Sequence, residues 1–337
     1  MYLIRIYIIM ALTSVLFLAG CKHRNKKPNV RDLKVETDIE RFERELFEMN
    51  VDSIPEAIDY FYEKYNDFYD IFSYHIVDLG RPSDKAYSGY LTIFVKDDLN
   101  REVYQEVNRV FPDLDFLEEK FNKAFRYFKF YFPDKEVPSL VSYISRFNYP
   151  YFTVSDYIGI GLDMYLGVNT EYYKRLGLPQ YQVRNMHPDK IPSDVLGNYA
   201  NALFPFNDST ENVLNRLIHE GKMMYFLDII LPEEPDTLKF GYTRDQLKWC
   251  KKNEEEMWTN LVEDELIFST DPMDIRKMIN PAPFTSFFTS ESPGRAAVWI
   301  GYRIIKEYAR RNPKLDPASI MKEQDFKKIL ESARYNP

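Results

Sequence analysis

Residues 213–231 read VLNRLIHEGKMMYFLDIIL, and the interpretation of the chain depends on this stretch. At about 100° per residue, a helix formed here is apolar on two opposite sides. One side carries Val213, Leu214, Leu217, Gly221, Met224 and Asp228, and the other carries His219, Met223, Phe226 and Ile230. An apolar surface on both sides is typical of a helix between layers of a protein interior. We therefore predict a buried helix from Glu211 to Leu231, ended by Pro232.

His219 and Glu220 begin a pattern used by zinc peptidases, His-Glu-x-x-His. In that pattern two imidazoles one helical turn apart hold the metal, and the glutamate acts as general base on the bound water. Here Met223 occupies the second ligand position, and a thioether is a poor ligand for Zn²⁺. We predict no metal site and no zinc cofactor, only a remnant site of His219, Glu220 and Lys222. Lys222 is expected to place a cation near Glu220, because an isolated buried carboxylate is costly.

Two other interpretations stay open at this point. In the first, His219 is a hydrogen-bonded histidine of the core. In the second, the chain is an active zinc metallopeptidase with atypical ligands, for which Glu263 or Glu265 would supply a third ligand from a later helix. The four histidines stand at positions 23, 75, 187 and 219, and no two share a helix face. Because the zinc-binding pattern is broken at Met223, we favour a protein that is not an enzyme.

The N-terminus resembles a secretion signal. Arg5 precedes an apolar run, Ile6 to Ala19, which is 14 residues long. A helix that spans a bilayer needs about 20 residues, so the run is typical of a signal peptide over residues 1–20. The run ends in Leu18-Ala19-Gly20-Cys21, which resembles the bacterial lipoprotein box. We predict that Cys21 is lipidated and anchors the chain to a membrane.

Charge and composition bound the remaining possibilities. Lys22 to Lys34 carries six basic residues and one acid, within a chain of 337 residues whose net charge is −8. We interpret residues 21–34 as a lipidated basic tether and residues 35–337 as a single domain. The acidic balance argues against nucleic-acid binding. With Cys21 lipidated, Cys250 has no partner for a disulfide and is expected to be a passive thiol.

The sequence of residues 35–337 predicts an α+β fold that is predominantly helical. Thr37 to Phe132 is expected to be helical, with aromatic stripes at three- and four-residue spacing that belong to the core. Val137–Phe147 and Tyr151–Leu166 predict a β-hairpin, with a bulge or a close backbone approach at Gly159 and Gly161.

Four helices are expected between that sheet and the last helix of the chain, in addition to the central one. They are Pro188–Phe204, Tyr242–Ser269 opened by Thr243, Asp271–Ile279, and Ser292–Arg311 with Pro293 in its first turn. A final helix is expected over Lys322–Ala333. The segment Asn207 to Thr210 offers N-caps for the central helix. The clusters Glu254–Glu256 and Glu263–Glu265 are expected to be solvated faces.

Five blocks carry a family resemblance. They are Tyr157–Gly167 (YIGIGLDMYLG), Leu217–Pro232 (LIHEGKMMYFLDIILP), Phe240–Trp258, Phe268–Phe284 and Glu291–Pro313. Together with the lipobox at Cys21 they resemble the gliding-motility lipoprotein GldB family of Bacteroidota. The resemblance covers about Val35 to Pro313.

This resemblance implies an outer-membrane lipoprotein on the periplasmic face. It also implies a distant relation to zincin-like peptidases, with a degenerate zincin-like helical body and a small sheet. The family supplies no catalytic residues to carry over, and Met223 departs from the peptidase pattern. Within this interpretation Arg295 is expected to pair with Glu220 or Asp163 in a buried network, or else to lie on the surface near a helix start.

We therefore expect a lipid-anchored, non-catalytic protein that acts in envelope-associated assembly or binding, with envelope proteins as partners. The first alternative is the zinc-dependent peptidase. The second is a lipid- or peptide-binding lipoprotein that uses the Tyr/Phe-rich N-terminal helices, which would require their aromatic rings to line an open groove.

Overall fold

The computed structural model describes residues 27–207 and 211–337. The chain divides into one unit of Met1–Asp32 and a second of Leu33–Pro337, and the second contains every helix and strand named below. Among the described residues, no helix combines the length and the apolar character needed to cross a bilayer.

Several predicted features lie outside the described residues. They are the signal peptide over residues 1–20, the lipidation site Cys21, the tether as far as residue 26, and three of the proposed N-caps, Asp208, Ser209 and Thr210.

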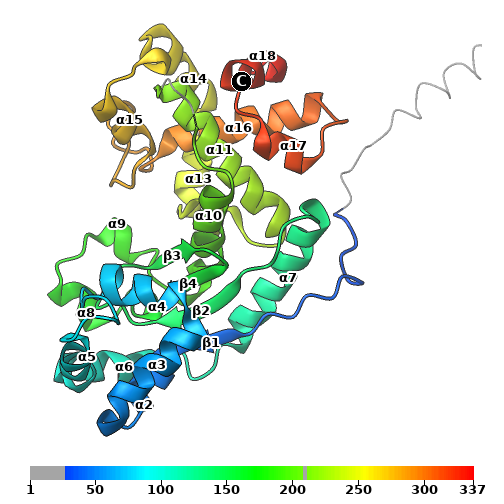
Figure 1. Ribbon diagram of the computed structural model, residues 1–337. Helices are drawn as coiled ribbons and strands as arrows, with labels where there is room; N and C mark the ends of the chain where they lie inside the picture. The colour runs from blue at the N-terminus through cyan, green and yellow to red at the C-terminus, as the bar shows by residue number, and fades with distance from the viewer. Residues whose placement is uncertain (1–26, 208–210) are drawn as a thin grey trace, which may run out of the picture. The chain divides into compact units, whose positions relative to one another are not determined.

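The Leu33–Pro337 unit is mostly helical, as predicted (Figure 1). Its first half contains α2 (Phe42–Glu48), α3 (Ile54–Tyr65), α4 (Asp67–Ile71), α5 (Tyr87–Lys96), α6 (Asp98–Val110) and α7 (Asp115–Tyr131). The middle contains α8 (Glu171–Arg175), α9 (Gln180–Val183), α10 (Ile191–Leu203) and α11 (Val213–Ile230). The last part contains α12 (Asp236–Phe240), α13 (Arg244–Lys252), α14 (Glu254–Glu263), α15 (Pro272–Ile279), α16 (Ala296–Arg311), α17 (Pro317–Lys322) and α18 (Phe326–Ala333).

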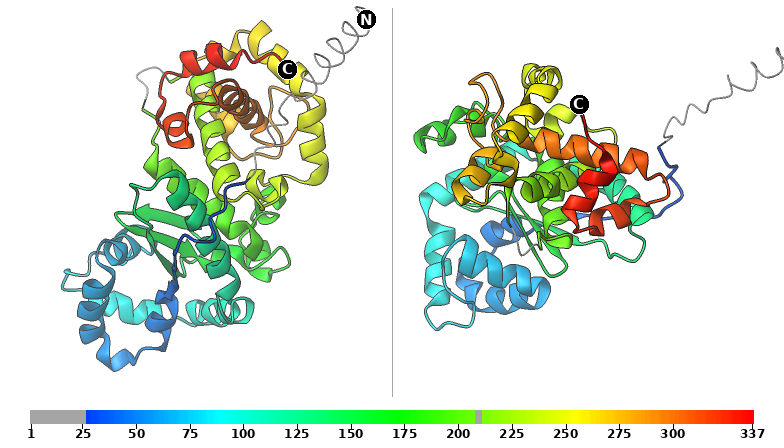
Figure 2. Two further views of the ribbon diagram at one scale, coloured as in Figure 1. Left: turned by 90° about the vertical axis from the view of Figure 1, so that its right-hand side faces the viewer. Right: turned by 90° about the horizontal axis from the view of Figure 1, so that it is seen from above.

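Four strands form one mixed sheet in the order β1-β2-β4-β3. They are β1 (Ile39–Arg41), β2 (Ser139–Tyr143), β3 (Tyr151–Val154) and β4 (Tyr157–Gly161). β2 lies parallel to both β1 and β4, whereas β3 and β4 are antiparallel. Helices α2 to α6 gather at one end of the unit and α11 to α18 at the other, with the sheet between them (Figure 2).

The predicted hairpin between Val137–Phe147 and Tyr151–Leu166 is wrong. The first segment pairs with the second in parallel, and the hairpin lies inside the second segment, between β3 and β4. Its turn contains Ser155 in a left-handed conformation, with φ of 46°. An alternation of apolar residues identifies a strand but not its direction. Here residues 144–150 reverse the chain into β3, and the turn between β3 and β4 reverses it again, so that β4 runs in the same direction as β2.

The two strand glycines do mark close approaches, as predicted. A Cβ on Gly159 would lie 2.4 Å from a ring carbon of Phe152, and one on Gly161 would lie 2.3 Å from the carbonyl oxygen of Tyr149. Gly159 thus makes room for a side chain of the neighbouring strand β3, and Gly161 for the backbone just before that strand.

Several predicted helix limits are also wrong. Thr37–Phe132 includes the short strand β1, and the expected helix Tyr242–Ser269 is divided at Asn253. Thr243 does open α13 with a full capping box. The side-chain amide of Asn253 then donates to the Trp249 carbonyl and ends that helix.

Two C-terminal helices begin later than predicted. α16 starts at Ala296 rather than at Ser292, because Ser292 is buried in the preceding loop and bonds to Thr285 and Thr289 there. Lys322–Ala333 is divided between α17 and α18, and the N-cap of α18 is Asp325. The N-cap of α11 is Asn212, whose side chain accepts from Asn215 N–H.

The aromatic stripes form the core of the N-terminal part. The ring of Phe42 meets five other rings at centroid distances from 4.8 to 5.9 Å, those of Phe61, Tyr65, Phe68, Tyr69 and Phe72. On α7, Phe121, Phe125 and Phe128 are buried, while Phe116 is partly exposed. The buried rings of these stripes cannot line an open groove, whereas Tyr60, Tyr62 and Tyr74 in the same part of the chain are 46–51% exposed.

Candidate functional site

Helix α11 is buried between layers, as its two apolar sides predict. It packs most closely on α16, where two glycines face each other. A Cβ on Gly221 would lie 2.1 Å from the carbonyl carbon of Gly301, and one on Gly301 would lie 1.7 Å from the carbonyl oxygen of Leu217. The two backbones are therefore in direct contact, and this contact fixes the position of the His219-Glu220 pair.

His219 is a core histidine. It is 2% exposed, and its Nε2 lies 3.2 Å from Oδ1 of Asn201 on α10. The side-chain N–H of Asn201 already donates to the Gly197 carbonyl oxygen, so Oδ1 of Asn201 is the acceptor and Nε2 of His219 carries the proton. The other ring nitrogen, Nδ1, is buried and has no hydrogen-bond partner among the described residues.

The surroundings keep His219 neutral. Burial lowers the pKa of the imidazole to about 3, and the positive charges of Lys222 and Arg216 contribute to this lowering. The rings of His219 and Phe206 form a T-shaped contact, with their centroids 5.4 Å apart. A neutral ring with its Nε2 proton given to Asn201 offers no lone pair at that nitrogen to a metal ion.

The second ligand position is filled by a hydrophobic side chain. Met223 lies one turn after His219 and is buried. Across residues 27–207 and 211–337, no group of three or more His, Cys, Asp and Glu side chains is arranged to hold a metal ion. Glu263 and Glu265 are both exposed to solvent.

Glu220 pairs with Arg295, one of the two partners proposed for that arginine. Nη2 of Arg295 lies 3.2 Å from Oε2 of Glu220, and its Nε donates to the carbonyl oxygen of Ile279. Arg295 is the residue before α16 and adopts a left-handed conformation with φ of 63°. The guanidinium therefore ties α11 and α15 to the start of α16.

Lys222 does not lie beside Glu220, contrary to the prediction. Its ammonium group is fully buried, donates to the carbonyl oxygen of Glu323 at 2.7 Å and lies over the ring of Phe326. Burial lowers the pKa of this ammonium to about 8, against the attraction of Glu323. Residues 220 and 222 differ by about 200° around the helix, so they point to different neighbours.

Asp163 belongs to a separate cluster. Its carboxylate accepts from the backbone N–H groups of Ser145 and Phe147 and from the Ser145 hydroxyl. Burial raises its pKa to about 6, although these bonds lower it. The bonds hold Arg146 and Phe147, which are two consecutive residues in left-handed conformations. Asp163 thus stabilises a strained turn.

The sequence analysis did not predict two clusters of polar side chains, which are centred on Asp228 and on Glu254. Asp228, at the end of α11, accepts from Lys239, Lys306 and Tyr302. Burial alone would raise the pKa of Asp228, but the charges of Lys306 and Lys239 lower it below its usual range.

Glu254 was expected to lie on a solvated face together with Glu255 and Glu256. Instead its carboxylate accepts from Trp299, Arg303 and Tyr335, and joins α14, α16 and the C-terminal end of the chain. Glu255 and Glu256 are exposed, as predicted. Nothing in the local sequence distinguishes Glu254, because its partners lie 45 or more residues away.

Cys250 is a passive thiol, as predicted. It is buried, and burial raises its pKa to about 12. A protonated and inaccessible thiol is neither a nucleophile nor a metal ligand at neutral pH.

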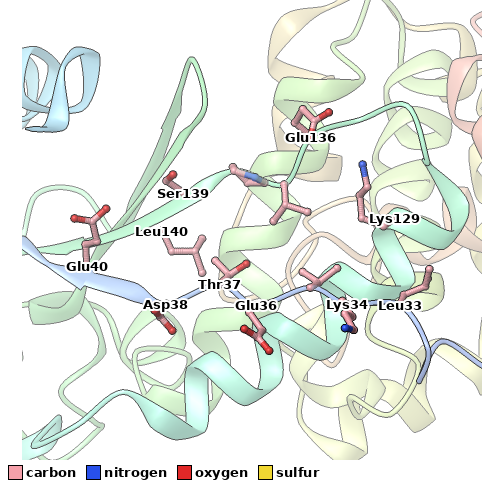
Figure 3. A pocket seen from close by; sticks show the side chains of 13 residues that line it. Leu33, Lys34, Glu36, Thr37, Asp38, Glu40, Lys129, Glu136, Ser139 and Leu140 are labelled. Atoms are coloured by element: carbon pink, nitrogen blue, oxygen red, sulfur yellow. The ribbon is translucent and has the colours of Figure 1, made fainter.

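A groove of about 670 Å³ lies away from these residues, where β1 and β2 diverge (Figure 3). One wall is residues 33–38, and the other is residues 136–139. The outer edge of the first wall is tied to α7, because Asn122 bonds to both backbone groups of Thr37 and Glu118 accepts from Ile39 N–H. The groove contains none of the predicted site residues.

Comparison with known proteins gives one match. A family model described as "Gliding motility protein GldB" matches residues 23–337, which is nearly the whole chain. No curated protein and no solved structure matches.

Proposed function

This chain belongs to the gliding motility protein GldB family, and on that premise we propose that it is a non-catalytic lipoprotein of the outer membrane. In this proposal Cys21 carries the lipid, the body faces the periplasm, and the protein acts in envelope-associated assembly by binding other envelope proteins. The zincin-like relation enters the proposal only as an origin for the His219-Glu220 pair.

The state of His219 carries the non-catalytic part of the proposal. A zincin needs an imidazole nitrogen free to bind the metal and a glutamate free to accept a proton from the bound water. Here Nε2 of His219 donates a hydrogen bond to Asn201, and the remaining nitrogen, Nδ1, is buried where the described residues supply no set of side chains that could complete a metal site. Glu220 is paired with Arg295. Both groups serve the packing of α11 against its neighbours.

Metal analysis of the purified full chain tests this part. We expect far less than one zinc ion per chain, unchanged in His219→Ala. His75→Ala, which alters an exposed histidine in the N-terminal helices, is the matched control. Stoichiometric zinc that is lost in His219→Ala but kept in His75→Ala would favour the alternative of a metallopeptidase with atypical ligands.

The sequence around Cys21 supports the anchor. It combines a 14-residue apolar run, small residues at positions 19 and 20, and a basic segment from Lys22 onward. The residue after Cys21 is Lys22 and not the aspartate that retains some lipoproteins in the inner membrane.

Fractionation of cells tests the anchor. Cys21→Ala should move the protein out of the outer-membrane fraction, whereas Cys250→Ala, at the only other cysteine, should leave it there. Persistent membrane association of Cys21→Ala would show a different attachment. Cross-linking in intact cells, followed by capture of the anchored protein, then identifies what it binds.

A further inference from the structure

The groove between β1 and β2 begins where the pairing of these strands cannot continue. In the register that places Ile39 opposite Leu140, residue 138 would lie opposite Thr37 and donate its N–H to the carbonyl oxygen of Glu36. Residue 138 is a proline, which has no N–H. The two walls therefore separate, and the space of about 670 Å³ between them is within the range of about 300–1,000 Å³ typical of ligand sites (Figure 3).

The backbone of the first wall has free hydrogen-bonding groups on its groove side. The N–H groups of Thr37 and Ile39 point away from the groove and bond to side chains of α7. Successive residues of an extended chain direct these groups to opposite sides, so Glu36 and Asp38 direct theirs into the groove. No other described residue bonds to the N–H or the carbonyl oxygen of Glu36, or to the N–H of Asp38. An unpaired edge of this kind can accept another extended segment as an added strand.

The side chains of this wall indicate which segment fits. Figure 3 shows Glu36 and Asp38 on one side of the wall and Thr37 on the other. Both acidic side chains are exposed, as is Glu136 on the opposite wall, and within residues 27–207 and 211–337 none of the three forms an ion pair. Opposite charges on directly facing residues of neighbouring strands attract each other. An added strand should therefore carry Lys or Arg at two alternate positions.

Two lysines also line the groove and limit the pattern further. The ammonium group of Lys129 donates to the carbonyl oxygens of Pro133 and Lys135, which hold it at the end of α7. Lys34 is exposed and stands two residues before Glu36. The position of the added strand that faces Lys34 should therefore be uncharged or acidic.

From this geometry we propose that the groove binds an extended segment of another envelope protein, with Lys or Arg at two alternate positions. The segment pairs with the free backbone groups of Glu36 and Asp38, and its two cations face their carboxylates. This inference deepens the proposed function, in which the chain binds other envelope proteins, and it rests on that function.

Fluorescence anisotropy with the purified full chain tests the proposal. The probe is labelled Lys-Val-Lys-Val-Thr with blocked ends, and the control probe has Glu in place of both Lys. We expect saturable binding of the first probe only. The double variant Glu36→Lys/Asp38→Lys should bind it at least about tenfold more weakly and should gain affinity for the Glu probe. Glu263→Lys/Glu265→Lys is the matched control, because it reverses two exposed carboxylates with the same spacing outside the groove.

Amide hydrogen exchange measured by NMR tests the backbone pairing. The Lys probe should slow exchange at Glu36 and Asp38, and should leave Thr37 unchanged because its N–H is already bonded to Asn122. Absence of binding, equal weakening by the two double variants, or unchanged exchange at Glu36 and Asp38 would each overturn the proposal. Binding that appears only after residues 22–26 are deleted would do the same, because the chain's own basic residues would then be the occupant.

Cross-linking in intact cells separates this inference from the function on which it rests. Glu36→Lys/Asp38→Lys should capture fewer envelope proteins than Glu263→Lys/Glu265→Lys does. Equal capture by both variants would overturn the inference and leave the proposed function intact. Capture of no envelope protein by the wild type would contradict the proposed function itself, and with it the source of the segment.

Discussion

Helices α11 and α5 have similar sequence patterns but different surroundings. Both are apolar on two sides, and both carry a glycine, Gly221 in α11 and Gly89 in α5. In α11 both sides are buried, and Gly221 touches the backbone of Gly301. In α5 one side is buried and the other is exposed, and Gly89 faces open space.

The comparison shows that apolar residues on two sides of a helix indicate a tendency of both sides to be buried. The tertiary structure decides which group covers each side. In α11 the glycine is a requirement of packing, because a single methyl group would collide with another backbone. In α5 the glycine costs helix stability without a packing benefit inside one chain. The same residue type thus has opposite effects on stability in the two helices.

The largest expected effect is at the contact of α11 with α16. Gly301→Ala should lower the free energy of unfolding by more than about 3 kcal/mol, since the methyl group would have to displace the backbone of Leu217. Urea unfolding followed by circular dichroism measures the loss.

Gly197→Ala in α10 is the control for Gly301→Ala. Its Cβ would lie 3.8 Å from Leu227, an ordinary contact, so the variant should be as stable as the wild type or slightly more stable. Equal destabilisation by both variants would contradict the packing argument.

The next effect concerns acid sensitivity. The pKa of His219 is about 3 in the folded chain, against its ordinary value of 6.5, so the unfolded chain binds a proton that the folded chain refuses. The stability supplied by the neutral ring is present above pH 6.5 and is lost as the pH falls. Between pH 6.5 and 4.5 the wild type should lose up to about 3 kcal/mol more than His219→Phe. An NMR titration of His219 that shows protonation near pH 6.5 in the folded chain would refute this.

Lys222 gives a smaller effect at alkaline pH. The pKa of its ammonium group is about 8 in the folded chain, against an ordinary value of 10.5, so burial of the charge costs stability below pH 8, and this cost falls as the pH rises. From pH 8 to 9.5 the wild type should gain up to about 2 kcal/mol relative to Lys222→Met. Urea unfolding at both pH values measures the gain, and parallel curves for the two proteins would show that Lys222 is not desolvated.

The smallest effect is on α5. Gly89→Ala should stabilise the monomer by about 0.5–1 kcal/mol, because alanine favours the helix and its methyl group meets no other atom. Urea unfolding followed by circular dichroism measures the gain. A destabilised monomer would mean that Gly89 lies in a tighter environment than α5 provides.

Much of the fold was accessible from sequence because it depends on local periodicity. The apolar pattern identified α11, α10 and α15, and Thr243 begins α13 with a cap, as predicted. The aromatic stripes on α3 and α7 predicted core positions because they repeat with the period of a helix. Limits were missed where one side chain ends a helix, as Asn253 does, or where a distant loop holds the start, as Thr285 does for Ala296.

The sequence by itself determined that α11 is apolar on two sides, that Met223 stands where a zinc ligand would be needed, and that Cys21 follows a short apolar run. These are properties of neighbouring residues and of helical geometry. Only the tertiary structure decided that Glu220 meets Arg295, that Lys222 meets Glu323, and that β2 lies parallel to β4. Those contacts join residues as much as 101 positions apart in the chain, and local periodicity carries no information about which distant group fills a given space.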